Sequence, residues 1–593
     1  MKKINIYHLM IALVLTGTAS SCKKDFLDRT PKNLVSEDVA FGSVSGITAL
    51  TVTLYNDMQT EDFSYEVSDQ AGYPSTTTDE AVRAYVWGSI NNAVVGNWFG
   101  SWDYAKIRRV NDFIEKIPAS AVDETSKKRF LAEARFIRAF HYFALVKRYG
   151  GVPLVAQVQQ YQTGDDVPGL VVSRNTEQEI YDFIAAELDA AVADLPANYS
   201  SDPDNQFRIS KYGALALKSR AMLYAASSAK YGTFQLNGLV GISPGLAGAY
   251  WQKAMDASNE IITSNQFSLY NANADKASNY QQLFLTVGNS EAIFTKVYSA
   301  PDKAHSFDFF NAPQSFKIDY GCATNPTLEM VEEYEYIDGS VGTLKLNDNA
   351  GKPIVYDNPG DLFKGKDPRM FATILTPFDS WQGGTLEIRR GVIDNGVKKT
   401  SESLTAVYPV GGTFTIVGKD GPLTTNDPTK TGFYIKKFMD PVNRVNDSRS
   451  TTPWMVFRYG EVLLNYAEAA FELGQTAQAT AAINQIRSRA GITTVATVNL
   501  EKIRHERKVE LAFENHRIWD LRRWHTATKV LNNTQFHALY PWIMWQNGVD
   551  PSQMKYTFEK AVAPKLTRTF PENLYLEPLP QQNPPYIQNP GYQ

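Results

Sequence analysis

Cysteine, histidine and net charge are all scarce in this 593-residue sequence, and each shortage excludes a class of protein. Two cysteines are too few for a disulfide framework. Seven histidines, with no Cys/His cluster at zinc-ligand spacing, indicate no structural zinc site. A net charge of −4 provides no basic field of the kind that nucleic-acid binding requires. We therefore expect no metal, no cofactor and no nucleic-acid partner.

Long hydrophobic runs are also scarce. A membrane-spanning helix needs about 20 apolar residues, and the sequence after residue 21 contains no such run. One shorter run, Leu9–Leu15, follows Lys2 and Lys3 and precedes a group of small residues. This order of charge, apolar run and small residues is typical of a secretory signal peptide, which we assign to residues 1–21.

The first cysteine, Cys22, follows the small residues Ala19, Ser20 and Ser21 directly. This arrangement resembles the lipobox of bacterial lipoproteins, although Ala19 occupies the position where leucine is usual. We predict that Cys22 is the lipidated N-terminus of the mature chain and that residues 22–36 form a polar tether. The lipid on Cys22 would carry two or more acyl chains, because stable anchoring needs at least two. Ordinary secretion with an incidental cysteine is the alternative.

The second cysteine, Cys322, has no partner for a disulfide, and we expect it to be a small buried residue.

Apolar residues at helical spacing predict several helices. One begins near Tyr104 and ends at Pro118, and a second ends at Gly150-Gly151. Further helices are predicted over about 212–228 and from about residue 250.

Two adjoining helices near residue 470 give the clearest pattern. Glu461–Leu473 and Thr476–Ala490 are separated by Gly474, and small residues recur at the spacing of a tetratricopeptide repeat. We therefore predict an all-α, tetratricopeptide-like scaffold of helix pairs with long interleaved loops and a few short strands. We expect an N-terminal helical region over 37–300 and a C-terminal region over 301–593. The latter would carry loop insertions at about 338–430 and an extended tail over 570–593.

Two short catalytic motifs are present in part, and neither is complete. Gly241–Gly245 reads GISPG, but Pro244 has no N–H to contribute to an oxyanion hole. The segment RHERKVE begins like a zinc-binding H-E-x-x-H motif, but Val509 occupies the place of the second histidine. We interpret it as a charged helix whose acidic and basic side chains partly neutralise one another. A distant pair of carboxylates for glycoside hydrolysis stays open.

Several blocks, in order along nearly the whole chain, resemble the SusD/RagB family of outer-membrane nutrient-uptake lipoproteins. They are the Cys22 lipobox followed by DFLD, WDYAKIRRVN from Trp102, EARFIRAFHYFALVKRYGGVPLV from Glu133, RYGEVLLNYAEA from Arg458, INQIRSRAGI from Ile483, IRHERKVELAFENHRIWDLRRW from Ile503, and the closing LEPLP and QNPGY.

The resemblance implies an all-α protein that is lipid-anchored in the outer membrane and faces the cell exterior. Such a protein captures a glycan without cleaving it. It delivers the glycan to a SusC-type TonB-dependent barrel, for which it acts as the extracellular lid. Capture of peptides or another nutrient is the main alternative. An outer-membrane hydrolase and an assembly scaffold without a nutrient ligand are the others.

Aromatic residues make up 12% of the sequence and suggest where a glycan could bind. Sugar rings stack their apolar C–H faces on aromatic side chains, while a few polar groups bind the hydroxyls. Three stretches and one further tryptophan combine these residue types. The candidate ligand-binding residues are Asp79, Arg83, Trp87, Asn97, Trp98, Tyr298, Phe309, Phe310, Tyr320 and Trp381.

Overall fold

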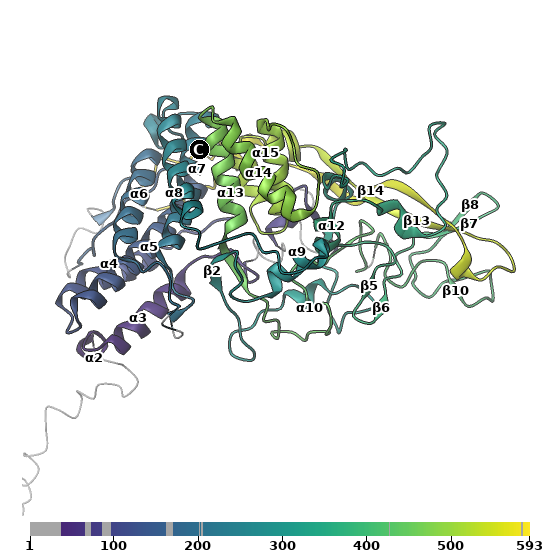
Figure 1. Cartoon of the computed structure of the whole chain (residues 1–593), viewed down its shortest axis with the longest axis horizontal. Coiled ribbons are helices and arrows are strands. Elements are labelled where there is room, and N and C mark those ends of the chain that lie inside the picture. Colours follow the sequence, from purple (N-terminus) through teal and green to yellow (C-terminus); the bar gives the residue numbers. More distant parts are fainter. Residues whose placement is uncertain are drawn as a thin grey trace, which may run out of the picture.

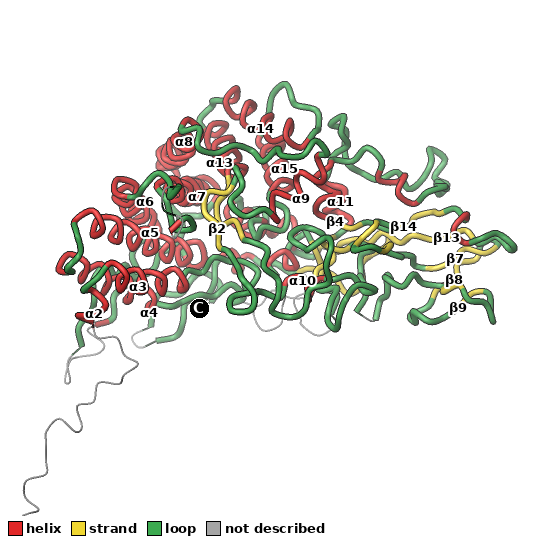
Figure 2. Tube along the Cα trace, turned by 60° about the horizontal axis from the view of Figure 1, so that its bottom comes forward, coloured by secondary structure: helices red, strands yellow, loops and turns green. Residues whose placement is uncertain are grey.

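The computed structural model describes residues 37–65, 73–85, 97–161, 170–200, 202, 205–425, 427–582 and 585–592. Cys22 and Trp87 lie outside the described residues. Helices predominate in the described part, and short strands are scattered between them, as the sequence predicted. Figure 2 shows most helices gathered at one end of the molecule and a strand-rich extension at the other.

The helical end is built from neighbouring helices in contact, with α5 on α6, α6 on α7, α7 on α8, α8 on α13 and α13 on α14 (Figure 1). Small residues allow the close approach, as where the Ser219 and Ser258 hydroxyls of α7 and α8 lie 2.7 Å apart. The helices of this body are α2 (Glu37–Phe41), α3 (Val44–Asp57), α4 (Tyr104–Lys116), α5 (Glu124–Tyr149), α6 (Glu177–Asp194), α7 (Lys211–Tyr231), α8 (Ala247–Thr263), α13 (Tyr459–Glu472), α14 (Thr476–Ala490) and α15 (Leu500–Glu510).

Helix ends follow local chemistry. The Asp123 side chain caps α5 by accepting from the backbone N–H of Ser126, and Thr176 forms a capping box with Glu179 at the start of α6. Gly150 ends α5 and Gly491 ends α14 with positive φ angles of 69° and 80°, a conformation that glycine adopts without steric cost. The predicted C-terminal ends of α5 and α14 are confirmed to within a residue.

Shorter helices connect this body to the rest of the chain. They are α9 (Lys276–Leu285), α10 (Phe307–Asn311), α11 (Leu328–Glu333), α12 (Pro368–Thr373), α16 (Arg517–Arg523) and α17 (Ala527–Leu531).

A four-stranded sheet forms the extension, in the order β14-β13-β7-β8. Its longest members, β13 (Thr534–Met544) and β14 (Tyr556–Arg568), form an antiparallel hairpin that the sequence did not predict. β7 (Gly391–Asp394) runs parallel to β13 and antiparallel to β8 (Val397–Thr400). The remaining strands form pairs: β1 (Ala81–Arg83) with β3 (Thr324–Pro326), β2 (Ala292–Lys296) with β12 (Trp454–Arg458), β4 (Ile374–Leu375) with β11 (Tyr434–Ile435), β5 (Ser380–Trp381) with β6 (Gly384–Thr385), and β9 (Val407–Tyr408) with β10 (Phe414–Thr415).

Glu506 and Glu510 of α15 are buried, and their cationic partners come from other elements. Glu510 accepts from Arg369 and Arg458, each at 2.8 Å, and also from Arg489. These charges are almost completely shielded from water, so each needs a partner to avoid a large desolvation cost. Our interpretation of a helix that neutralises itself was therefore wrong, because most of the compensation is tertiary.

Residues on either side of position 300 share one hydrophobic core. Ion pairs also cross this position: Asp79 pairs with both Arg517 and Lys508 at 2.8 Å, and Arg220 pairs with Glu461 at 2.6 Å. The predicted division near residue 300 stays a prediction about sequence regions. In space the two regions are interlocked.

Among the described residues, we find no helix that combines the length and apolar character of a membrane span.

Candidate functional site

Three aromatic rings at and beside α10 form a cluster that reaches the surface. The ring centroids of Phe309 and Phe310 lie 5.3 Å apart, and Tyr320 lies 5.9 Å from the first and 6.1 Å from the second. Phe309 is buried, Phe310 is half-buried and Tyr320 is 51% exposed. We call Phe309, Phe310 and Tyr320 the α10 aromatic surface.

The chain leaving α10 folds back on the helix, which brings Tyr320 to the two phenylalanines. The N–H groups of Cys322 and Ala323 donate to the carbonyls of Ala312 and Phe310, each at 2.9 Å. Gly321 makes the return possible, because a Cβ on this residue would lie 2.5 Å from the Ala312 carbonyl oxygen. The position of Tyr320 is thus fixed by backbone bonds.

A buried asparagine holds α10 itself. The Asn311 side chain donates to the Phe307 carbonyl at 2.9 Å and accepts from the Thr324 N–H at 3.1 Å. Both of its polar ends are satisfied inside the protein, as a fully buried amide requires.

Two of the three sequence stretches proposed for binding meet beside this surface. Strand β1 pairs with β3, placing Arg83 opposite Thr324, and the Tyr85 hydroxyl donates to the Gly321 carbonyl. The segment that begins at Asp79 therefore runs alongside the segment that carries Tyr320. Trp87 follows Tyr85 by two residues in the sequence and lies outside the described residues.

Tyr298 belongs to a neighbouring aromatic cluster centred on Phe63. Phe63 lies 6.0 Å from Tyr298, 4.1 Å from His305 and 5.0 Å from Phe307 of α10, measured between ring centroids. Tyr298 is half-buried, so one part of its ring is available at the surface. The sequence analysis missed Phe63, which stands alone among polar residues in EDFSYE and carries no helical or strand period.

His305 fixes this cluster to the segment around Thr452. Its Nδ1 accepts from the Phe307 N–H at 3.2 Å, so Nε2 carries the proton and donates to the Thr452 carbonyl at 3.1 Å. Burial lowers the pKa of His305 to about 4. The ring is therefore neutral at pH 7, and the cluster is apolar apart from its hydrogen bonds.

Asp79 and Arg83 are buried and committed to contacts within the protein. Burial alone would raise the pKa of Asp79, but Arg517 and Lys508 outweigh it and hold the pKa well below the ordinary range. The Arg83 guanidinium lies over the Tyr85 ring, 5.3 Å from its centroid. In this arrangement both residues support the segment that they belong to.

Trp98 and Trp381 are also largely buried, with exposed fractions of 8% and 3%. The glycine-containing stretch PFDSWQGG predicts that Trp381 is an exposed loop residue. This prediction is wrong, because Trp381 lies in strand β5 and its side chain is buried in the core. Asn97 is exposed, with a φ of 75° at the start of the turn that carries Trp98. The helical blocks predict core positions for Trp102, Trp519 and Trp524. Trp519 and Trp524 are buried as predicted, whereas Trp102 is half-buried at the edge of the core.

The α10 aromatic surface is suited to stacking. The members that reach solvent are the half-buried Phe310 ring and the exposed Tyr320 phenol. In the part of the chain that the structure describes, no group of three or more His, Cys, Asp or Glu side chains is arranged to hold a metal ion. Ser243 of the GISPG motif lies exposed in a turn before the 3₁₀ helix Pro244–Leu246, and in this position it follows no strand.

Two family models match the chain. Residues 259–592 match the model described as the SusD family, and residues 25–223 match a model described as starch-binding associating with outer membrane. A SusD-like protein of Formosa agariphila, P2, is 24% identical over 566 residues, covering 89% of this chain and 92% of the relative.

Solved structures show the same fold. A SusD-like protein from Bacteroides fragilis superposes with a TM-score of 0.69 at 24% identity, covering 94% of this chain and 99% of that protein. A SusD-like carbohydrate-binding protein, also from Bacteroides fragilis, superposes with a TM-score of 0.67 at 24% identity, covering 91% and 98%.

Proposed function

Because this chain belongs to the SusD family, we propose that it captures a glycan at the cell surface without cleaving it and delivers it to a SusC-type TonB-dependent barrel. In this proposal the protein is anchored in the outer membrane through a lipid on Cys22 and acts as the extracellular lid of the barrel. The α13–α14 pair is its tetratricopeptide-like unit.

The observation that carries the proposal is the α10 aromatic surface. An exposed phenol next to a half-buried phenyl ring offers two apolar faces whose positions are set by backbone hydrogen bonds. Rigid rings of this kind bind sugar C–H faces with little loss of side-chain freedom. The carbohydrate-binding protein of the same fold supports a glycan as the ligand class.

Tyr298 is proposed as a further contact, because it is half-buried and connected to α10 through Phe63 and Phe307. Trp87 and Asn97 stay proposed contacts in the segment that follows Tyr85. The buried candidates are proposed to have a supporting role without touching the glycan. They hold in place the segments that carry the exposed residues, and they are Asp79, Arg83, Trp98 and Trp381.

The test uses the chain from residue 23 onward, which retains every described residue. Its migration in native gels containing laminarin, starch or other polysaccharides is compared with binding of a peptide panel by calorimetry. Recovered ligand is then analysed for cleavage. Retardation by one class of polysaccharide, without cleavage products, is the expected result. Tight binding of peptides alone would show that the ligand is a peptide and not a glycan. Cleavage of the ligand would overturn the non-enzymatic assignment.

Tyr320→Ala is the variant that locates the site. Loss of one stacking ring costs about 1.4 kcal/mol, which weakens binding roughly 10-fold. Tyr161→Ala is the matched control, since Tyr161 is 60% exposed and is not part of the α10 aromatic surface. Equal weakening by both variants would remove the assignment to α10.

A further inference from the structure

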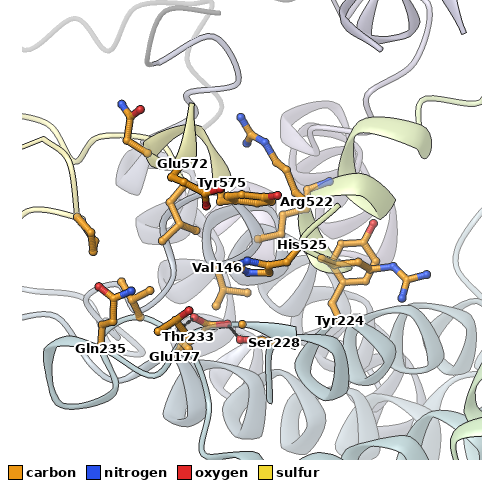
Figure 3. Close-up of a pocket in the computed structure, with 18 of the residues that line it drawn as sticks. Val146, Glu177, Tyr224, Ser228, Thr233, Gln235, Arg522, His525, Glu572 and Tyr575 are labelled. Carbon is orange, nitrogen blue, oxygen red and sulfur yellow. Dashed lines mark hydrogen bonds between the residues drawn. The ribbon is translucent and has the colours of Figure 1, made fainter. Parts of the chain in front are cut away.

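A cavity of about 300 Å³ lies on the helical body, between the end of α7 and the segment 572–591 (Figure 3). Tyr224 and Arg523 are among the residues that line it. Figure 3 shows Thr233 and Gln235 on one rim and Glu572 on the opposite rim. We call it the tail cavity. It shares no residue with the α10 aromatic surface.

Both rims of the tail cavity are held by one guanidinium. Arg174 donates to the Asn589 side chain at 2.9 Å and the Ile587 carbonyl at 2.7 Å, on the side of segment 572–591. It also donates to the Leu239 carbonyl at 3.3 Å, on the side of Gln235. The cavity is therefore bounded by segments that are bonded in place.

An aromatic ledge forms part of the wall. The His525 and Tyr575 rings are stacked, with centroids 4.4 Å apart and an angle of 10° between their planes, and the His525 side chain is exposed. The backbone of His525 has a φ of 50°, which is unfavourable for a residue with a Cβ. Such strain is often retained where a side chain has a functional position. The exposed imidazole face offers an apolar C–H group a place to stack.

Three polar side chains at the rims are uncommitted. Within the part of the chain that the structure describes, Thr233, Gln235 and Glu572 make no side-chain hydrogen bond or ion pair. Their hydroxyl, amide and carboxylate groups are the types that bind sugar hydroxyls. By contrast, Glu177 at the base is fully used, because its two oxygens accept from the Ser228 hydroxyl at 2.5 Å and the Gly241 N–H at 2.7 Å.

The charges around the cavity disfavour an anionic ligand. Its cations already have partners: Lys147 pairs with Glu61 at 2.8 Å, and Arg523 pairs with Glu468 at 2.6 Å. Arg522 pairs with Glu577 at 2.7 Å through Nη2, while its buried Nε and Nη1 have no hydrogen-bond partner among the described residues. Glu572 is left as an exposed negative charge at the rim, and it would repel a carboxylate or sulfate.

We propose that the tail cavity is a second binding site, which takes an uncharged saccharide of one or two rings. Its volume lies at the lower end of the range for small-molecule sites, about 300 to 1,000 Å³, so a long glycan chain does not fit. The ledge stacks on one sugar ring while Gln235, Thr233 and Glu572 bind its hydroxyls. This site is separate from the α10 aromatic surface and goes beyond the function proposed above.

The test measures saturation-transfer NMR and calorimetry on the chain from residue 23 onward. The probes are glucose, galactose, xylose, cellobiose and maltose, with glucuronic acid as the charged comparison. His525→Gly removes the ledge and also relieves the positive φ, so the fold is preserved. Loss of the stacking ring is expected to weaken binding about 10-fold. Thr233→Trp fills the cavity and is expected to abolish binding.

Tyr161→Ala serves as the control and is expected to leave binding of these small probes unchanged, because Tyr161 is exposed and belongs neither to the tail cavity nor to the α10 aromatic surface. The proposal is overturned if none of the uncharged probes binds at 10 mM, a concentration about tenfold above a weak millimolar Kd. It is also overturned if glucuronic acid binds as well as glucose, or if His525→Gly has no effect. Native gels with polysaccharides, run on the same variants, distinguish the tail-cavity proposal from the function proposed for the α10 aromatic surface. Binding of small saccharides without retardation by any polysaccharide would support the tail cavity and contradict the function proposed for α10.

Discussion

Replacing Glu61 by glutamine tests how far one buried charge stabilises this fold. The Glu61 carboxylate accepts from Lys147 at 2.8 Å, from the Trp519 indole at 2.8 Å and from Arg148. It thereby joins the segment after α3 to helices α5 and α16. Glutamine has nearly the same shape, so the change removes the charge and leaves the packing in place.

The expected loss follows from the pKa of Glu61. Burial would raise this pKa, but Lys147 and Arg148 outweigh it and lower the pKa from 4.5 to about 2. One pKa unit corresponds to about 1.4 kcal/mol, so the variant should lose about 3 kcal/mol at pH 7. Because the folded-state pKa is depressed, this stabilisation is complete above pH 4.5 and is lost as the pH falls toward 2. At pH 3 roughly 1.4 kcal/mol should remain.

The assay is urea unfolding followed by tryptophan fluorescence at pH 7 and pH 3. Glu124→Gln is the control: Glu124 pairs with Lys127 on α5, but its side chain is 80% exposed, and such pairs contribute little. The double variant Glu61→Gln/Lys147→Met should recover at least half of the loss, because it leaves no unpaired lysine. A loss of equal size at pH 7 and pH 3 would refute the reasoning.

Two further predictions concern single residues. Cys322 is completely buried, and burial raises its pKa to about 12, so in the chain from residue 23 onward a thiol reagent at pH 8 should label it only after urea is added; rapid labelling of the folded protein would contradict this. Gly474→Ala should lower the free energy of unfolding by about 1 kcal/mol, because the φ of this residue is 78° and a Cβ is strained there. The loss should be no larger, because no atom lies within 4 Å of the new Cβ. Gly432→Ala should lower the free energy of unfolding further, since its Cβ would lie 2.1 Å from the Leu539 carbonyl oxygen. Equal losses for the two variants in urea titrations would contradict this prediction.

The helices could be predicted from the sequence because their limits are local. Gly150, Gly474 and Gly491 end their helices through their own backbone freedom, and the apolar spacing between them needs no knowledge of distant partners. A few short strands were also expected, in TLEIRR, TFTIVG and GFYIKKFM, and these stretches overlap β6, β10 and β11. The other strands do not coincide with a predicted segment.

The β13–β14 hairpin was missed because its sequence contains a residue that disfavours a strand. Pro541 lies inside β13 opposite Phe558, and proline normally argues against a strand interior. Here the Pro541 carbonyl accepts from the N–H of Arg390 at 2.8 Å. No pattern near residue 541 reveals that Arg390 will be there.

For the candidate site, the sequence could supply residue types but not exposure. Trp98, Trp381 and Tyr320 all stand in polar, glycine-containing stretches, yet only Tyr320 of the three is exposed. Exposure depends on what packs above each ring, which is tertiary information. The His525–Tyr575 ledge was missed for a similar reason, because the two rings are 50 residues apart and meet only in the folded chain.

Side-chain contacts between early and late segments of the chain have a consequence for the order of folding. Asp79 precedes its partner Arg517 by 438 residues in the sequence. Glu61 precedes Trp519, whose indole N–H it accepts, by 458 residues. During synthesis the early helices can form, but these carboxylates stay hydrated until the later segment arrives. Contacts of such long range slow folding and prolong the exposure of apolar surface. We therefore expect the newly made chain to mature late and as one unit, with neither region reaching its native state before the other.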